Sequence, residues 1–454
     1  MKLTFLGAAG TVTGSRYLLE DDNRKILIDA GLFQGRKELR ERNWMPPTFN
    51  PADIDAVLLT HAHIDHSGYI PRLVKDGFRG PIYCTSATQD LCNILLPDSG
   101  YLQEEDAANA NRYGYSKHQP ALPLYTQADA EVALEQFRAI DFGTRYALKD
   151  SLLSFTMYRA GHILGAAFIR VDDGMTSVLF GGDIGRLNNP VMKPPAKIQE
   201  ADYLLIESTY GDRLHNTDDP TEDIFRIVRD TAARGGTVVI PAFAVGRTQA
   251  ILYHIYLLKK QGRIADIPVF VDSPMAIRAT ALLSRHPADH RLPPDICAAI
   301  DSMTRYTQTT EESKEINSRN SGMPKIIISA SGMATGGRVL HHLKYYIGDE
   351  RNTILLAGFQ ADGTRGDRLV RGEKELAIHG QMWPVRAQIA QLDNMSAHAD
   401  YAEILTWLGN FTAPPRRVFI THGEPQAATA MRGHIETRFG WDAHVPEHGE
   451  TVEL

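Results

Sequence analysis

Three histidines and an aspartate crowd one short segment near the start of the chain, His61-Ala62-His63-Ile64-Asp65-His66. Neutral imidazole and carboxylate groups are the ligands that suit zinc in hydrolytic sites. The segment follows the apolar run of residues 56–60, so we expect it to form a turn at the end of a strand. Alternate residues of such a turn point to different sides. His61 and His63 can therefore face one metal while Asp65 and His66 face a second.

One such segment cannot complete two metal sites, so further ligands must come from elsewhere in the chain. His162, Asp183 and His422 each lie beside glycine at the end of a predicted strand. Glycine there allows the backbone to bend, so that short side chains can reach a shared point. Asp183 has two carboxylate oxygens and is the natural bridge between two metals. Taken singly, each histidine would more often be a core or loop residue and the aspartate a turn cap.

The elements that must position these residues fall into three stretches. Residues 1–208 read as short strands separated by glycine turns, and residues 385–454 return to this strand-rich pattern. Between them, in residues 209–384, strands alternate with amphipathic helices, which is typical of a parallel sheet covered by helices. We therefore expect one domain built from both ends of the chain and a second α/β domain inserted into it. Residues 97–127 are polar and rich in tyrosine, and we expect helical turns and loop there.

The composition indicates the class of protein but does not indicate a substrate. With 43% hydrophobic and 23% charged residues the chain is an ordinary globular protein, and its net charge of −7 argues against a surface coated for non-specific nucleic-acid binding. A local basic groove remains compatible with this charge. The three cysteines, Cys84, Cys92 and Cys297, fit no paired zinc spacing and are expected to be buried thiols. No run of residues is suited to span a membrane, so we expect a cytoplasmic protein.

The pattern His-x-His-x-Asp-His, followed by the later histidine, aspartate and histidine, resembles the metallo-β-lactamase superfamily. The resemblance implies a four-layer αββα sandwich. Asp29, at the end of the third predicted strand, matches the first motif of that family, a carboxylate that orients the metal ligands. Without the resemblance, an aspartate at this turn would be unremarkable.

Further motifs resemble the β-CASP nucleases, a branch that includes the cleavage-and-polyadenylation endonuclease and ribonuclease J. Its extra acidic residue and histidines match Glu207 in Glu-Ser-Thr-Tyr-Gly, His398 in Ser-Ala-His-Ala-Asp, and His422. Residues 241–249 and 329–338 also look like signatures of this branch. The match covers essentially the whole chain and implies an inserted α/β domain of mainly parallel sheet. A histidine at the position of His422 accompanies RNA-cutting members, so the resemblance favours a ribonuclease. The Ser-Ala-His-Ala-Asp and Gly-Met-Ala-Thr-Gly-Gly-Arg motifs are more similar to the cleavage-type endonucleases than to ribonuclease J, so we expect an endoribonuclease.

The resemblance also implies a mechanism that uses two zinc ions per chain and single-stranded RNA as substrate. The two ions would ionise a bridging water and neutralise the phosphoryl oxygens. The implied ligands are His61, His63, His162 and Asp183 for one ion, and Asp65, His66, Asp183 and His422 for the other. His398 would be the general acid for the departing ribose oxygen, with Glu207 holding its ring, and Asp65 joins them as a catalytic residue. Without the resemblance, Glu207 would more often form a salt bridge and His398 would neighbour a helix cap.

A glycine-rich loop in the middle of the chain is the candidate for binding RNA phosphates. It runs from a predicted strand into a predicted helix, and its candidate residues are Ser331, Gly336, Gly337 and Arg338. Free backbone N–H groups, the helix dipole and an arginine would suit a phosphate. We expect the inserted domain to hold RNA over the metal site through this loop, although a glycine-rich turn with no ligand has a similar sequence.

Three other functions are compatible with parts of the sequence. A DNA-processing nuclease is disfavoured by His422. A hydrolase of small esters or thioesters would leave Glu207, His398 and the inserted domain without a role. A non-catalytic RNA-binding subunit would be expected to lack metal ligands, and every ligand is present here. A homodimer through an apolar face of the inserted domain is also possible.

Overall fold

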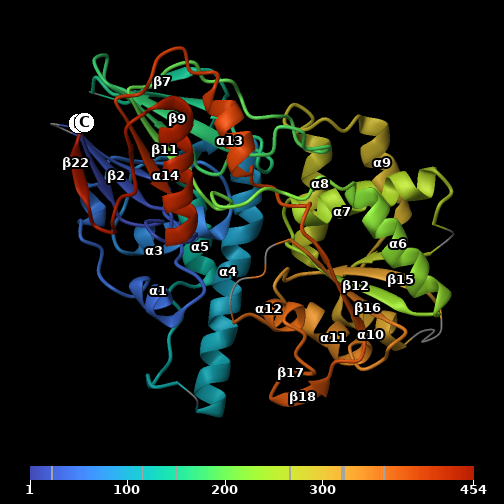
Figure 1. The fold of residues 1–454 in the computed structure, drawn as a ribbon. Helices are drawn as coiled ribbons and strands as arrows, with labels where there is room; N and C mark the ends of the chain where they lie inside the picture. The colour runs from blue at the N-terminus through green and yellow to red at the C-terminus, as the bar shows by residue number, and fades with distance from the viewer. Residues whose placement is uncertain are drawn as a thin grey trace. The chain divides into compact units, whose positions relative to one another are not determined.

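The computed structural model describes residues 1–21, 24–114, 116–149, 151–264, 267–318, 323–358, 360 and 363–454. These residues form two compact units (Figure 1). The first combines Met1–Leu214 with His398–Leu454, and the second consists of His215–Ala397. The first unit is therefore built from both ends of the chain.

Two mixed seven-stranded sheets form the centre of the first unit. In spatial order, the strands of the first sheet are β22 (Thr451–Glu453), β1 (Lys2–Phe5), β2 (Tyr17–Asp21), β3 (Arg24–Ile28), β4 (Ala56–Leu58), β5 (Ile82–Thr85) and β6 (Phe137–Ile140). Those of the second are β21 (Ala443–His444), β20 (Arg417–Thr421), β11 (Tyr203–Glu207), β10 (Ser177–Phe180), β9 (Ala167–Asp172), β8 (Ser154–Arg159) and β7 (Arg145–Ala147). The antiparallel pair β1 and β22 joins the two ends of the chain within the first sheet.

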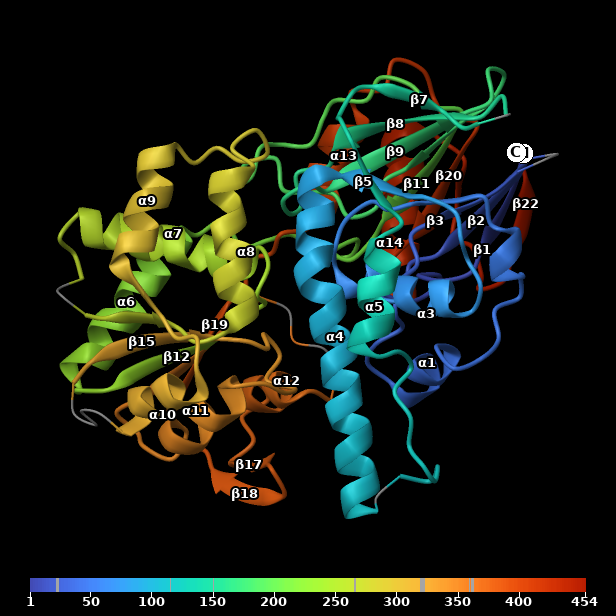
Figure 2. The ribbon, with the colours of Figure 1, turned by 180° about the vertical axis from the view of Figure 1, so that it is seen from behind.

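The two sheets share one apolar core, because inward-facing side chains from both contribute to a single buried cluster. Phe5 and Ile26 of the first sheet belong to it together with Phe155, Phe180 and Phe419 of the second. Helices cover the outer faces, with α4 (Ser86–Tyr113) packed on β5 and β6 and α14 (Pro425–Phe439) packed on β20 and β21 (Figure 2). The helical segments of this unit are α1 (Lys37–Arg42), η1 (Pro51–Asp53), α2 (Ile64–Ser67), α3 (Ile70–Lys75), α4 (Ser86–Tyr113), α5 (Gln127–Leu134), α13 (Tyr401–Leu408) and α14 (Pro425–Phe439).

The expectation of helical turns and loop in residues 97–127 is wrong for its first part. Helix α4 continues through Pro97 to Tyr113 and ends at Gly114, which has a left-handed backbone. The helix persists because its small residues allow close packing: a Cβ at Gly100 would lie 2.6 Å from the backbone of Thr126 and Gln127, just before and at the start of α5. The proline therefore lies inside the helix without ending it.

An all-parallel six-stranded sheet forms the centre of the second unit. In spatial order, its strands are β14 (Thr304–Tyr306), β13 (Val269–Val271), β15 (Lys325–Ser329), β12 (Thr237–Pro241), β16 (Thr353–Ala357) and β19 (Gln388–Leu392). The remaining elements are the hairpin β17 (Glu375–Ile378) and β18 (Gln381–Pro384), and the helices α6 (Pro220–Ala233), α7 (Arg247–Lys260), α8 (Pro274–Arg285), α9 (Pro294–Met303), α10 (Thr310–Ser318), α11 (Val339–Tyr346) and α12 (Arg365–Val370). The predicted fold class, a metallo-β-lactamase sandwich with an α/β unit of parallel sheet, is confirmed.

The second unit extends past residue 384, where the strand-rich pattern was expected to return to the first domain. Strand β19 pairs with β16 in parallel register from Thr353 and Gln388 to Ala357 and Leu392, so it adds an edge strand to the parallel sheet. Cys84, Cys92 and Cys297 are buried free thiols, as expected. Among the described helices, none combines the length and the apolar character that a bilayer crossing requires.

Candidate metal centre

Three predicted site residues leave the same edge of the second sheet of the first unit. Strands β10, β11 and β20 are neighbours and run parallel, so their carboxyl ends meet at one edge. Asp183 follows β10, Glu207 ends β11, and His422 follows β20. His162 reaches this edge in the connection from β8 to β9, since β9 runs antiparallel to β10 and begins where β10 ends.

The histidine-rich segment leaves the first sheet in the same way. It follows β4, and its last part forms the short helix α2. Asp29 follows the adjacent parallel strand β3 and is fully buried. Its carboxylate accepts hydrogen bonds from the backbone N of Thr60 at 2.7 Å and from Nδ1 of His66 at 2.7 Å. A Cβ at Gly31 would lie 1.6 Å from the carbonyl oxygen of Asp65, so only glycine allows this close approach.

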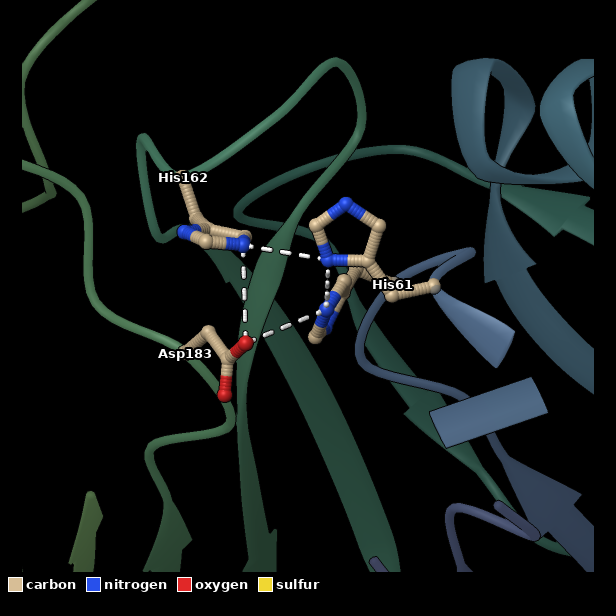
Figure 3. Close-up of side chains that lie close together, drawn as sticks. His61, His162 and Asp183 are labelled. Atoms are coloured by element: carbon tan, nitrogen blue, oxygen red, sulfur yellow. Dashed lines mark hydrogen bonds and ion pairs between the residues drawn. The ribbon is translucent and has the colours of Figure 1, made fainter. Parts of the chain in front are cut away.

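The first predicted ligand set brings four donor atoms to one point. Figure 3 shows the imidazoles of His61 and His162 turned towards the carboxylate of Asp183. Nε2 of each lies 3.4 Å from Asp183 Oδ2, and the two Nε2 atoms lie 3.1 and 3.2 Å from Nδ1 of His63. In a tetrahedral site with zinc–nitrogen bonds of about 2.0–2.1 Å, donor atoms lie about 3.3 Å apart. The four donors therefore fit zinc.

The second predicted ligand set meets on the other side of Asp183. His66 Nε2 lies 3.2 Å from His422 Nε2, and His422 Nε2 lies 3.3 Å from Asp65 Oδ2. Asp183 presents Oδ1 to this set, 3.3 Å from His66 Nε2, while its Oδ2 faces the first set. Oδ1 is buried and accepts no hydrogen bond within the described structure, which leaves it available to a cation. The two carboxylate oxygens of Asp183 therefore face the two predicted ligand sets.

The protonation of the cluster also suits metal binding. Burial lowers the pKa of His61 and His162, and it lowers the pKa of His63 to about 3, so these rings are neutral ligands at neutral pH. Burial alone would raise the pKa of Asp183, but the surrounding histidines, His422 first among them, outweigh it and hold the pKa well below its ordinary value. A buried carboxylate of this kind requires positive charge next to it, which a bound cation supplies.

Two threonine hydroxyls that were not predicted from the sequence orient the rings of the candidate ligands. Thr60 Oγ1 lies 2.8 Å from Asp29 Oδ2 and 3.1 Å from Nδ1 of His61. Thr209 Oγ1 donates to Glu207 Oε2 at 2.5 Å and lies 3.1 Å from Nδ1 of His422. A hydroxyl that donates to a carboxylate is left to accept from the ring N–H, so it fixes Nδ1 as the protonated nitrogen and Nε2 as the donor to metal. Thr60 directly precedes His61, and Thr209 follows Glu207 by two residues. This closeness in sequence to predicted site residues is the only sequence feature that could have pointed to them.

We expect Thr209→Val to weaken zinc retention by about 10- to 100-fold, because the ring of His422 loses the partner that fixes its tautomer. Thr209→Ser keeps the hydroxyl and should retain zinc as the wild type does. Competition with a zinc chelator measures both variants. If Thr209→Val holds zinc as tightly as Thr209→Ser, the hydroxyl does not orient His422.

His398 and Glu207 form a pair beside the metal ligands. Nδ1 of His398 lies 2.9 Å from Glu207 Oε2 and 3.8 Å from Asp183 Oδ2. Glu207 also accepts a hydrogen bond from the backbone N of Ile184 at 2.7 Å, so its position is fixed independently of the ring. An isolated antiparallel bridge between Gly185 and His398 holds the backbone of His398. The His398 side chain keeps 21% of its surface exposed, whereas that of Glu207 is fully buried.

The predicted phosphate loop lies in the second unit, and much of its hydrogen-bonding capacity is already used. Ser331 Oγ accepts from the backbone N of Thr335 at 3.0 Å and of Gly336 at 3.3 Å, so these two N–H groups, expected to be free, are bonded within the loop. Arg338 donates to buried Asp272 at 2.7 Å and to the carbonyl oxygens of Thr307 and Gln308. Gly337 has a left-handed backbone just before α11. Charge reversal at Arg338 would therefore also disrupt the core of this unit.

Three known domain families match consecutive parts of the chain. Residues 18–199 match the metallo-beta-lactamase superfamily domain, and residues 248–369 match the Beta-Casp domain. Residues 382–446 match the Zn-dependent metallo-hydrolase RNA specificity domain. The last match includes both His398 and His422.

Curated relatives extend the similarity over the full chain. Ribonuclease TTHA0252 of Thermus thermophilus is 35% identical over 465 residues, which cover 100% of both chains. Transcription termination factor FttA of Methanocaldococcus jannaschii is 29% identical over 100% of this chain and 72% of that protein. A solved structure of a protein of unknown function from Enterococcus faecalis covers 100% of this chain and 99% of its own, with a TM-score of 0.55 and 15% identity, which supports the fold alone.

Proposed function

The chain belongs to the metallo-β-lactamase superfamily of metal-dependent hydrolases, with a β-CASP domain and an RNA specificity domain, and we propose that it is a zinc-dependent endoribonuclease. Single-stranded RNA is the proposed substrate. We assign the metal-binding unit as the catalytic domain and the parallel-sheet unit as the inserted domain. The buried free thiols favour a reducing compartment, the cytoplasm.

The observation that carries the proposal is the His398–Glu207 pair, whose imidazole lies 3.8 Å from the carboxylate proposed to bridge the metals. Hydrolysis of a phosphodiester needs a proton for the departing ribose oxygen, and a charged imidazole next to the metal ligands can supply it. A hydrolase of small activated esters has less need of such a donor. The ribonuclease among the relatives, which aligns along its whole length, supports the same substrate.

The residues of the chain divide the chemistry between them. Two bound zinc ions would lower the pKa of a water molecule and neutralise charge on the phosphoryl oxygens. Asp183 holds both donor sets at a fixed separation through its two oxygens. His398 donates its proton to the leaving oxygen, and Glu207 orients the ring through Nδ1, which leaves Nε2 to face the substrate. Thr209 links the proton donor to the metal site, because it contacts both Glu207 and His422.

The charge of Glu207 should set the alkaline limit of activity. Burial opposes the charged form of His398, but the carboxylates of Glu207 and Asp183 outweigh it and raise the pKa of His398 to about 9. A proton donor must be protonated, so cleavage should fall as the pH rises through this pKa. In Glu207→Gln the pKa of His398 should drop, and we expect the alkaline limb of the pH–rate profile to move down by at least about one unit. If the alkaline limb of the pH–rate profile does not move in this variant, a group other than His398 causes the loss of activity at high pH.

The direct test is incubation of the purified protein with end-labelled single-stranded RNA and a DNA of the same sequence, with bound zinc measured in parallel. We expect about two zinc ions per chain, as a two-metal site requires, and internal cuts in the RNA alone. If DNA is cut and RNA survives, the protein is a DNA nuclease of the same fold. If the products are released stepwise from one end, it is an exonuclease.

A further inference from the structure

Arg16, just before β2, carries a buried positive charge with no negative partner in the described part of the chain. Only 6% of its surface is exposed. Its Nη2 donates to the carbonyl oxygen of Gly31 at 3.1 Å, its guanidinium lies 3.9 Å from the centroid of the Tyr69 ring, and its buried Nε has no hydrogen-bond partner among the described residues. Burial lowers the pKa of Arg16 to about 10, so the group stays charged at neutral pH.

Two more basic side chains lie around the ring of Phe33, two residues after Gly31, which accepts the hydrogen bond from Arg16. The guanidinium carbon of Arg42 lies 5.4 Å from the centroid of that ring, and the ring of His448 lies 6.2 Å from it. The ring packs closely against Gly14, where a Cβ would lie 2.5 Å from it. Arg16, Arg42 and His448, together the basic cluster, thus come from three separate segments of the first unit.

The electrostatics of the basic cluster favour an anion. Burial, then the charge of Arg42 and then that of Arg16, lower the pKa of His448, so the fields of all three groups overlap and the imidazole is a neutral N–H donor. Arg36 and Arg40 lie on the same segment as Arg42, and within the described structure none of these arginines forms an ion pair with a carboxylate. This local excess of positive charge stands out in a chain with a net charge of −7.

The residues that surround Arg16 contact the candidate metal centre. Ser15, which precedes Arg16, has its Oγ 3.3 Å from Nε2 of the metal-ligand candidate His66. Gly31, which accepts the hydrogen bond from Arg16, follows Asp29 by two residues and packs against the backbone of Asp65. An anion held by the basic cluster would therefore lie close to the metals without being coordinated by them.

We propose that Arg16, Arg42 and His448 form a binding site for a phosphate of the RNA strand, separate from the scissile phosphate at the metals. This proposal rests on the proposed function. Planar guanidinium groups bind phosphate oxygens through paired hydrogen bonds, and a phosphate would supply the negative charge that buried Arg16 lacks. The phosphate could belong to the backbone of the strand or to its 5′ end. In both cases the site would fix the register of the RNA relative to the metal centre.

The test measures RNA binding in a His398→Ala background, so that the RNA stays intact. A double variant, Arg42→Gln with His448→Gln, removes two members of the basic cluster and leaves Arg16 and the apolar core unchanged. Arg138→Gln is the control, because Arg138 is an exposed arginine of the same unit that bonds only backbone carbonyls within the described residues. Two RNAs are compared, one with a 5′-phosphate and one with a 5′-hydroxyl group. Bound zinc and the melting temperature are measured for each variant.

We expect the double variant to bind RNA roughly tenfold more weakly, with unchanged zinc and melting temperature. The slope of log affinity against log salt should fall by about 0.7 for one lost phosphate contact. A loss with both RNAs identifies a backbone phosphate, and a loss confined to 5′-phosphorylated RNA identifies a terminal phosphate. An affinity and slope equal to those of Arg138→Gln overturn the proposal.

Arg16→Lys provides a second variant, since it retains the charge but removes the paired hydrogen bonds of the guanidinium. We expect weaker binding of RNA with zinc retained, whereas unchanged binding would exclude Arg16 from the site. The outcomes also separate this proposal from the proposed function. If the protein with His398 intact binds RNA through the basic cluster but does not cut it, the nuclease assignment falls and the phosphate site stands.

Discussion

Replacement of His398 with alanine is expected to slow RNA cleavage by a factor of about 10²–10⁴, the usual contribution of a general acid, while bound zinc stays unchanged. The imidazole contacts Glu207 at 2.9 Å and belongs to neither predicted ligand set, but with Asp183 and Glu207 it forms a further group of donors close enough together to hold a metal ion. Its loss should therefore remove the proton donor and leave the metal ligands in place. Single-turnover cleavage of RNA, measured together with zinc content, checks both halves of this expectation.

His444→Ala is a matched control for this variant. His444 also contacts a glutamate, with Nε2 2.6 Å from Glu450 Oε1. It lies on β21, in the sheet whose strand β11 carries Glu207. We expect it to cleave RNA at the wild-type rate. If His398→Ala loses zinc as well as activity, His398 acts as a metal ligand. If it keeps full activity, the leaving oxygen takes its proton from another source.

Replacement of Asp183 with asparagine should have a still larger effect. The carboxylate presents Oδ2 to His61 and His162, and Oδ1 to His66. Asparagine keeps the size of the side chain but removes the charge and leaves one strong oxygen donor, so the two sites can no longer share it. We expect at least one zinc to be lost and cleavage to fall more than about 10³-fold, since the metals contribute several kcal/mol to the transition state.

Asp202→Asn is the control for this change. Asp202 is also a carboxylate of the second sheet, but it accepts hydrogen bonds from the backbone N and the hydroxyl of Ser177, at the start of β10 rather than at its end. We expect normal zinc content and cleavage. An Asp183→Asn protein that binds two zinc ions and cuts RNA at the wild-type rate would remove Asp183 as the bridge.

The convergence of the candidate metal ligands could be predicted because these residues follow strands that the sequence pattern indicates. The runs before His61, Asp183 and His422 are short and apolar, and glycines mark the turns after them. Asp183 and His422 follow strands of one sheet that run parallel, so their carboxyl ends lie at one edge although the residues are far apart in the sequence. Glu207 was predicted only through the family resemblance, and it ends β11, which pairs in parallel with the strand before Asp183.

Features that depend on tertiary packing could not be predicted in this way. Pro97 and the polar residues after it suggested loop, yet α4 continues because α5 packs closely against it at Gly100. Arg338 was expected to face a phosphate, but its partner Asp272 lies at the end of another strand, and no local pattern connects the two. The unpaired charge of Arg16 became visible only when its surroundings were known, because a charged residue beside a predicted strand is common.

The pairing of β1 with β22 and the return of the chain to the first unit at His398 have a consequence for synthesis of the protein. A ribosome makes His61, His63 and His66 early, yet His398 and His422 emerge only after the whole second unit has been translated. Until then the nascent chain lacks one proposed metal ligand and the proposed proton donor, and its first sheet lacks the edge strand β22. Translation that stops within residues 215–397 therefore yields a chain with an incomplete metal centre. If His398 and His422 have the proposed roles, a chain truncated within residues 215–397 cannot cut RNA.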